Sequence, residues 1–214
     1  NAPERPLTAI IGGAKVSTKI GVLEALAKKV DALVISGGMA NTFLSARGVN
    51  VGRSLCEYDQ IATASAIEGT IAARDGRLIL PSDVIVAHKL ERDSASETVP
   101  AESVPPDSMI LDIGPSSLAD IELQIRASRT LVWNGPLGAF EFPPFNRGTI
   151  AIATSAAEQT SAGQLTSVAG GGETLAAINQ AGVSGQFSYL STAGGAFLEW
   201  LEGRALPGVE VLYG

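Results

Sequence analysis

The sequence predicts an α/β fold, a Rossmann-like three-layer α/β/α domain with a mainly parallel, roughly six-stranded sheet. Two observations predict this fold class. Short apolar runs alternate along the chain with segments whose apolar residues recur at helical spacing, which is typical of repeated strand–helix–strand units. Most of the runs are apolar at both alternate positions, as expected for strands of a parallel sheet that helices cover on both faces.

The expected elements follow from this alternation in chain order. Strands are expected at Leu7–Ile11, Ala32–Ile35, Arg77–Leu80, Met109–Asp112, Thr130–Trp133, Leu165–Ala169 and Phe187–Leu190, with a further extended piece at Val84–Ala87. The first helix is expected to begin near Lys15, because Val16, Ile20, Leu23, Ala27 and Val30 recur at helical spacing. The later helices are expected at Asn41–Arg47, Asp59–Arg74, Ser116–Arg126, Arg147–Thr160, Thr174–Gln180 and Ala196–Glu202.

One domain is expected over residues 1–214. A chain of 214 residues of which 45% are hydrophobic can bury a full core, and we find neither an internal repeat nor an obvious linker. Residues 88–107 interrupt the pattern, because they are rich in Glu, Ser and Pro. We expect them to form either a solvated excursion or an added β-hairpin.

Composition excludes several classes of partner. The formal net charge of −7 argues against a nucleic acid or an anionic membrane surface, because neither is attracted to an anionic protein. Cys56 is the only cysteine, so no intrachain disulfide can form, which fits a reducing cytoplasm. The first six residues lack the apolar core of a secretory signal, and the uncharged stretch from Thr174 to Leu198 is too polar for a membrane span. We expect a cytoplasmic protein and, since no segment marks an interface, a monomer.

Five apolar runs end in glycine turns. The five turns are Gly12-Gly13-Ala14-Lys15, Gly37-Gly38-Met39-Ala40-Asn41, Asn134-Gly135-Pro136-Leu137-Gly138, Gly170-Gly171-Gly172-Glu173-Thr174 and Gly194-Gly195. A strand followed by glycine and then by a helix is where open α/β sheets bind ligands, because the backbone can approach closely and the helix aims N–H groups at an anion. The five turns together predict a ligand-binding edge of the sheet.

The first turn carries positive charge. Lys15 and Lys19 are four residues apart, so one helix would place them on the same face beside free N–H groups, which suits a phosphate. The alternative is two solvated lysines on an ordinary glycine turn. Neither a Walker A motif nor a G-x-G-x-x-G motif occurs in the sequence, so a P-loop is excluded and a dinucleotide fold is disfavoured.

The fourth turn carries the opposite charge. Glu173 offers a hard oxygen ligand for Mg²⁺ on a polyphosphate, and Thr174 adds a hydroxyl. The alternative is that Glu173 only stabilises the start of the next helix.

The third turn is a long segment after a strand. Pro136 and Leu137 are candidates for the wall of a ring-binding site, and Glu141 for an acceptor of ribose hydroxyls. The alternative is a packed loop, with Trp133 in the core. His88, the only histidine, ends an expected strand and is interpreted as structural.

These turns, taken in order, resemble the phosphoglycerate kinase family. The segments that carry the resemblance are the runs from Gly12 to Ile20, Gly37 to Leu44, Asp112 to Pro115, Trp133 to Glu141, Gly170 to Thr174, Ser191 to Ala196 and Leu198 to Val209. The resemblance covers nearly the whole chain but only the C-terminal, nucleotide-binding half of that enzyme, so the N-terminal domain is expected to be absent.

The resemblance implies roles for particular residues. It implies that Lys15 is catalytic and steadies the transferring phosphoryl group, that Lys19 contacts nucleotide phosphate, that Glu141 binds the ribose and that Glu173 holds Mg²⁺. The full set of implied nucleotide contacts is Gly13, Ala14, Lys15, Lys19, Gly37, Gly38, Asn134, Pro136, Gly138, Glu141, Gly170, Gly171, Gly172, Glu173 and Thr174.

The chain departs from the family pattern at three residues. Glu173 stands where the family usually has Asp, and Ala193 and Ile110 stand where many members have glycine. The longer carboxylate is expected to alter Mg²⁺ geometry, and the two larger residues are expected to narrow the nucleotide pocket.

The resemblance implies reversible transfer of the acyl phosphate of 1,3-bisphosphoglycerate to ADP in glycolysis, giving ATP and 3-phosphoglycerate. This chain alone is expected to bind ADP or ATP with Mg²⁺ and to show little or no turnover, because the phosphoglycerate ligands bind only with the N-terminal domain and the family closes two domains around its substrates. The alternative is a non-catalytic nucleotide-binding or regulatory module that has lost its partner domain.

Overall fold

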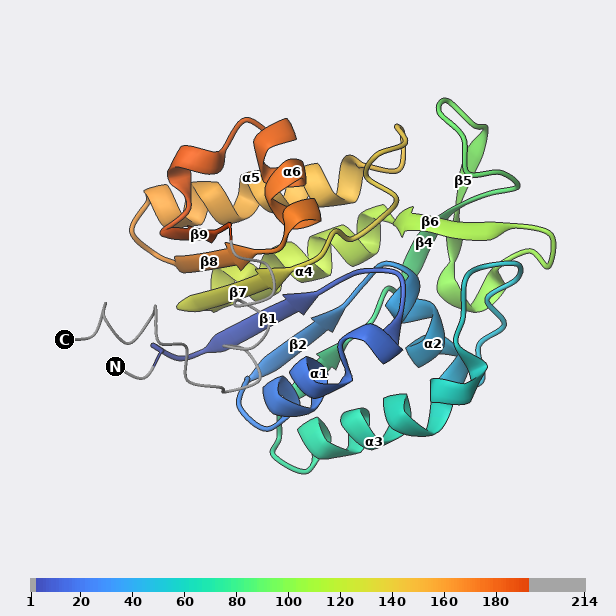
Figure 1. The fold of residues 1–214 in the computed structure, drawn as a ribbon, viewed down its shortest axis with the longest axis horizontal. Coiled ribbons are helices and arrows are strands. Elements are labelled where there is room, and N and C mark those ends of the chain that lie inside the picture. The colour runs from blue at the N-terminus through green and yellow to red at the C-terminus, as the bar shows by residue number, and fades with distance from the viewer. Residues whose placement is uncertain (1–2, 193–214) are drawn as a thin grey trace.

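The computed structural model describes residues 3–192 and contains the expected parallel sheet. Its six strands are β1 (Leu7–Ile11), β2 (Ala32–Ile35), β3 (Arg77–Ile79), β7 (Thr130–Asn134), β8 (Thr166–Gly170) and β9 (Tyr189–Ser191). They lie in the order β3-β2-β1-β7-β8-β9, and every neighbouring pair is parallel. The sheet and its two layers of helices are seen in Figure 1.

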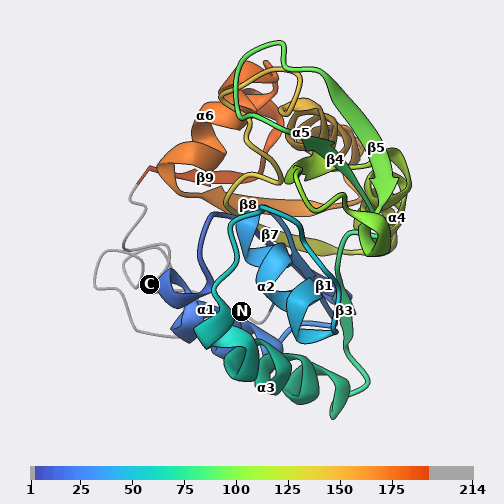
Figure 2. The same cartoon turned by 90° about the vertical axis from the view of Figure 1, so that its right-hand side faces the viewer.

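Helices cover both faces of this sheet. On one face lie α1 (Ile20–Ala27), α2 (Gly38–Ala46) and α3 (Ile61–Ala72), and on the other lie α4 (Pro115–Ala127), α5 (Arg147–Ser161) and α6 (Gly172–Gln180). Figure 2 shows the two layers on opposite sides of the strands. The α/β/α class predicted from the sequence is therefore confirmed.

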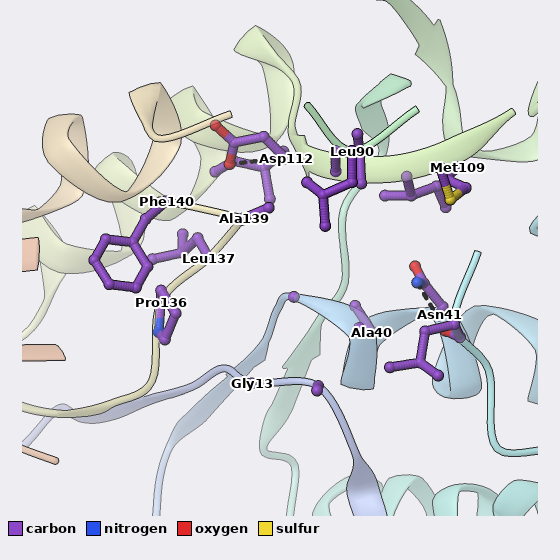
Figure 3. A pocket seen from close by; sticks show the side chains of 18 of the residues that line it. Gly13, Ala40, Asn41, Leu90, Met109, Asp112, Pro136, Leu137, Ala139 and Phe140 are labelled. Atoms are coloured by element: carbon purple, nitrogen blue, oxygen red, sulfur yellow. Dashed lines mark hydrogen bonds between the residues drawn. The ribbon is translucent and has the colours of Figure 1, made fainter. Parts of the chain in front are cut away.

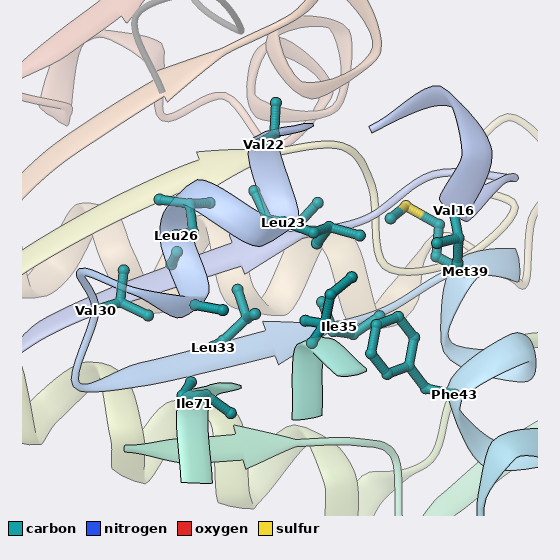
Figure 4. Packing of buried hydrophobic residues seen from close by; sticks show 14 of the residues in the cluster. Val16, Val22, Leu23, Leu26, Val30, Leu33, Ile35, Met39, Phe43 and Ile71 are labelled. Atoms are coloured by element: carbon teal, nitrogen blue, oxygen red, sulfur yellow. The ribbon is translucent and has the colours of Figure 1, made fainter. Parts of the chain in front are cut away.

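The core divides into two parts because successive strand residues face opposite ways. Leu33 and Ile35 of β2 pack with α1, α2 and α3, whereas Val34 between them packs on the α4 and α5 side. Figure 4 shows the first part, with Leu23 of α1 and Phe43 of α2 meeting β2. Hydrophobic residues therefore occur at both alternate positions of these runs, because both faces of the sheet are covered.

A second, smaller sheet adjoins the first. Its strands β4 (Asp83–Ala87), β5 (Ser96–Pro100) and β6 (Met109–Ile113) lie in the order β5-β4-β6, with both pairs antiparallel. Of the two forms expected for residues 88–107, the added hairpin is the one observed, since β5 pairs along the whole of β4. The strand expected at Met109 exists, but it belongs to this second sheet and not to the parallel one.

The helix expected to begin near Lys15 begins later. A short 3-10 turn covers Val16–Thr18, Lys19 leaves the helical conformation with φ −134°, and α1 starts at Ile20. The Lys19 side chain instead folds back, and its Nζ donates to the Gly12 carbonyl at 2.7 Å. The expectation that Lys15 and Lys19 share one helix face is therefore wrong.

In the described part of the chain, three further 3-10 turns occur at Tyr58–Gln60, Ala101–Ser103 and Ser184–Gln186. The helix expected at Ala196–Glu202, the fifth glycine turn and Ala193 lie outside the described residues. Within residues 3–192, none of the helices is long and apolar enough to cross a membrane.

Candidate functional site

The four glycine turns within the described residues meet at one edge of the sheet. The parallel register pairs Ile11 with Ile35 and with Asn134, and it pairs Asn134 with Gly170. The carboxyl ends of β2, β1, β7 and β8 therefore form a row, and the turns that follow them are neighbours. This edge is where open α/β sheets place their ligand sites.

A cavity of about 320 Å³ lies between this edge and the second sheet. Of the residues predicted to contact a nucleotide, those that line it are Gly13, Ala14, Gly37, Gly38, Pro136, Gly138, Glu141 and Glu173. The remaining wall is mostly apolar and includes Leu55, Leu90, Met109 and Ile110. Figure 3 shows Gly13 and Pro136 on the sheet side of the cavity, and Leu90 and Met109 across from them.

The glycines of three turns are also required by contacts between the turns themselves. A Cβ on Gly12 would lie 2.0 Å from the Pro136 oxygen, and one on Gly37 would lie 2.8 Å from the Gly13 oxygen. The Gly37 N–H donates to the Leu137 carbonyl at 3.0 Å. The turns therefore form one hydrogen-bonded floor, in which close backbone packing explains part of the glycine content.

Lys19 and Glu173 bring opposite charges from two different turns together. Burial lowers the pKa of Lys19 from 10.5 to about 8, and the nearby Glu173 carboxylate opposes this shift. The Lys19 Nζ would lie 3.4 Å from a Cβ on Gly13, a residue of the cavity wall. The ammonium group is thus half-buried at the edge of the cavity.

Lys15 lies differently. Its backbone is extended (φ −134°, ψ 131°) and its side chain is exposed. It does not line the cavity, so the structure brings only one of the two predicted lysines to the cavity edge.

The fourth turn opens α6. Gly171 has φ +97° and precedes the helix, while Gly172 borders open space and Glu173 lies in the first turn. A carboxylate there is favourable to the helix dipole, so the helix-stabilising alternative and the ligand role remain compatible. Among residues 3–192 no group of three or more His, Cys, Asp or Glu side chains is placed to hold a metal ion.

Thr174 and Asn134 support the turns from beneath and do not form the cavity wall. The Thr174 hydroxyl is fully buried and accepts the Gly135 N–H at 2.7 Å. Asn134 Nδ2 donates to the Gly170 carbonyl, also at 2.7 Å. These bonds tie the third turn to the fourth. Gly170, Gly171 and Gly172 likewise do not line the cavity.

The third turn combines both interpretations given to it. Pro136, Leu137 and Glu141 line the cavity. Trp133 is fully buried in the core, and its indole N–H donates to the Gly135 carbonyl at 2.7 Å. The turn is thus a cavity wall fixed by a buried tryptophan.

Sequence reasoning missed Asp112 as a residue of the site. Asp112 is 2% exposed, and its two carboxylate oxygens accept the N–H groups of Ile113 and Gly148, each at 2.9 Å. Burial raises the pKa of Asp112 from 3.8 to about 7, against the lowering effect of these hydrogen bonds and of Arg147. The available signal was a lone carboxylate inside an apolar strand, just before a Gly-Pro pair.

Asp112 leaves no room for side chains on two neighbouring glycines. A Cβ on Gly138 would lie 2.4 Å from Asp112 Oδ1, and one on Gly148 would lie 2.6 Å from it. Asp112 therefore joins the second sheet, the third turn and the start of α5.

Asn41 and Leu55 also line the cavity without having been predicted there. Ile110 lies in the wall, as its position in the expected nucleotide pocket implied. His88 lies outside the cavity wall, with Nδ1 3.2 Å from the Asp107 carbonyl oxygen.

The fold is that of a doubly wound α/β domain, and its glycine-floored cavity lies at the carboxyl ends of the strands, where such domains place ligand sites. The family model for phosphoglycerate kinase matches residues 1–204, and the chain belongs to the phosphoglycerate kinase family. The resemblance found in the sequence is thereby confirmed.

Relatives and solved structures agree with this assignment. The chain is 61% identical over 211 residues to a phosphoglycerate kinase of Methylorubrum extorquens, covering 99% of this chain and 53% of the relative. It is 58% identical over 210 residues to that of Agrobacterium fabrum, covering 98% of this chain and 52% of the relative.

The solved phosphoglycerate kinase of Coxiella burnetii matches with a TM-score of 0.92 and 44% identity, over 99% of this chain and 53% of that one. The enzyme of Pyrococcus horikoshii matches with a TM-score of 0.80 and 27% identity, over 98% of this chain and 52% of that one. The chain therefore spans about half the length of the curated relatives it matches.

Proposed function

We propose that this chain binds ADP or ATP with Mg²⁺ in the cavity, as the nucleotide-binding half of a phosphoglycerate kinase. The observation that carries the proposal is a cavity with Glu173 in its wall, the Lys19 ammonium group beside the cavity-lining Gly13, and mostly apolar residues in the remaining wall. One side of this cavity suits a polyphosphate and the other suits a purine base.

The phosphates would lie on the glycine turns. Backbone N–H groups at the open start of α6 and the ammonium group of Lys19 supply positive potential there, in a chain whose net charge is −7. Because the floor is held by hydrogen bonds between the turns, these groups need little rearrangement when an anion binds. Glu141, which also lines the cavity, would accept hydrogen bonds from the ribose hydroxyls.

Glu173 fits a magnesium site that is shared with the nucleotide. Mg²⁺ prefers six oxygen ligands and keeps several waters, so one carboxylate together with phosphate oxygens is a common arrangement. When bound, the ion would neutralise phosphate charge. Glu173 would hold the metal end of the ligand near the start of α6. Its charge also opposes the lowering of the Lys19 pKa that burial causes.

We further propose that the whole enzyme transfers the acyl phosphate of 1,3-bisphosphoglycerate to ADP, a cytoplasmic glycolytic reaction. Lys15, exposed in extended backbone beside the cavity-lining Ala14, is free to turn toward a phosphoryl group that arrives from outside this chain. Steadying such a group by a positioned cation is the main catalytic requirement of phosphoryl transfer. The phosphoglycerate would be held by the half of the enzyme that lies beyond this chain, so this chain alone should turn over little or no substrate.

Calorimetric titration of ADP into the chain, with and without Mg²⁺, tests the binding proposal. We expect Lys19→Ala to weaken ADP binding at least tenfold, since a buried charge-assisted contact is lost. Lys28→Ala is the matched control, because Lys28 is exposed at the far end of α1. Absence of ADP binding at millimolar concentration, or equal affinity in both variants, would contradict the proposal, and near-normal turnover in a coupled assay would contradict the expected inactivity.

A further inference from the structure

A buried amide oxygen in the cavity wall has no hydrogen-bond partner. Asn41, on α2, lines the cavity and is 1% exposed. Within the part of the chain that the structure describes, its Oδ1 atom receives no hydrogen bond. Buried polar atoms are nearly always paired, so an unpaired acceptor in a ligand cavity indicates a donor that the ligand supplies.

The orientation of this amide is fixed by its other end. Asn41 Nδ2 donates to the Leu55 carbonyl at 3.0 Å. Flipping the amide would set two oxygen atoms against each other, so the oxygen must face away from Leu55. In Figure 3 the oxygen points away from that bond, toward the side of the cavity where Leu90 and Met109 lie.

The segment that holds the amide is itself anchored to α2. The Glu57 N–H donates to Thr42 Oγ1 at 3.0 Å. The segment from Leu55 to Glu57 is therefore hydrogen-bonded to α2 at two places, Asn41 and Thr42. The acceptor is therefore rigidly placed among apolar neighbours, where an unpaired polar contact is most costly.

We infer that Asn41 determines which nucleobase this site accepts, by receiving a hydrogen bond from the 6-amino group of adenine. This inference rests on the proposed function, since it requires a purine nucleotide in the cavity. Adenine carries a donor at position 6, whereas hypoxanthine carries a keto oxygen there. A keto oxygen facing Asn41 Oδ1 would leave two buried acceptors opposed, which discriminates against it.

The test is a comparison of dissociation constants for ADP and inosine 5′-diphosphate (IDP), which share ribose and phosphates. We expect the unmodified chain to bind ADP roughly tenfold more tightly, the effect of one neutral hydrogen bond. Asn41→Leu should bring the two dissociation constants within about twofold of each other, mainly because it weakens the binding of ADP. Ser36→Ala is the control, because Ser36 Oγ is also buried and unpaired among the described residues but does not line the cavity.

Each outcome decides the matter. Equal affinity of the unmodified chain for ADP and IDP, or an unchanged preference in Asn41→Leu, overturns the inference while leaving nucleotide binding intact. Failure of both nucleotides to bind overturns the proposed function as well. If Asn41→Leu does not fold, purine riboside 5′-diphosphate, which has no group at position 6, replaces the variant. We expect it to bind between ADP and IDP, and affinity equal to that of ADP would overturn the inference.

Discussion

Asp112 should make this chain less stable as the pH rises from 5 to 8. Its carboxyl is 2% exposed, and burial raises its pKa from 3.8 to about 7. The folded protein therefore binds this proton more tightly than the unfolded chain does. The stabilisation is complete below the unfolded pKa and is lost as the pH rises through about 7.

The expected size of the effect follows from the two pKa values. Raising the pKa from 3.8 to about 7 corresponds to about 4 kcal/mol over the full range, of which about 3 kcal/mol is lost between pH 5 and pH 8. Two other shifted groups act at the upper edge of this window or below it. Lys19 titrates at about 8 and above. The pKa of Asp83, which burial raises, is brought below 3.8 by hydrogen bonds from Ser117 and Ser116, so Asp83 acts only in acid.

Urea unfolding at several pH values between 5 and 8 measures this slope directly. Asp112→Asn cannot titrate and should flatten the dependence, whereas Asp120→Asn, an exposed position on α4, should keep it. A free energy of unfolding that increases from pH 5 to pH 8, or the same slope with and without Asp112, would exclude this role for the Asp112 carboxyl.

Three further predictions concern the turns. ADP affinity should fall as the pH rises above about 8, because Lys19 loses its proton there. Lys19→Arg stays charged and should bind ADP equally well at pH 7 and pH 9. Calorimetry that finds no pH dependence of ADP binding in the unmodified chain would exclude a phosphate contact from Lys19. Gly12→Ala should lower the free energy of unfolding by about 1 to 3 kcal/mol or more, the usual effect of overpacking, because its methyl group would lie 2.0 Å from a backbone oxygen. Gly69→Ala is the control, because its methyl group would face open space in α3, and urea unfolding should find it neutral or stabilising. An equal loss of stability in Gly12→Ala and Gly69→Ala would contradict the packing argument. Thr174→Val leaves the buried Gly135 N–H without its 2.7 Å acceptor and should cost about 1 to 3 kcal/mol; an unchanged urea midpoint would show that this bond is dispensable.

The sequence predicted the parallel sheet well because local pattern and burial agree there. The run Leu7–Ile11 is buried at all five positions, so its apolar composition reports its environment directly. The run at Met109 is equally apolar, yet it pairs antiparallel with β4. Apolar composition reports burial and not the identity of the neighbouring strand, so the second sheet was not predictable in this way.

Site positions that depend on glycine in the backbone were predictable from the sequence. Positions that depend on how a side chain folds back were less predictable. Glycine after a strand located Gly13, Gly37 and Gly138 at the cavity. The helical spacing of Val16 and Ile20 suggested one continuous helix, but Lys19 between them has a non-helical backbone, and its side chain binds the Gly12 carbonyl. Contacts of this kind override local periodicity, and they cannot be predicted from the spacing of apolar residues.

The glycine-floored edge of the sheet is the nucleotide site that we propose. Amide chemical shifts of the chain, recorded by NMR during titration with ADP and Mg²⁺, test it most directly. We expect the amides of Gly13, Gly37 and Gly138, which line the cavity, to shift together. The amide of Gly163, in the turn before β8 at the opposite edge, should stay unchanged. Shifts confined to the edge that holds Gly163, or no shifts at saturating nucleotide, would contradict it.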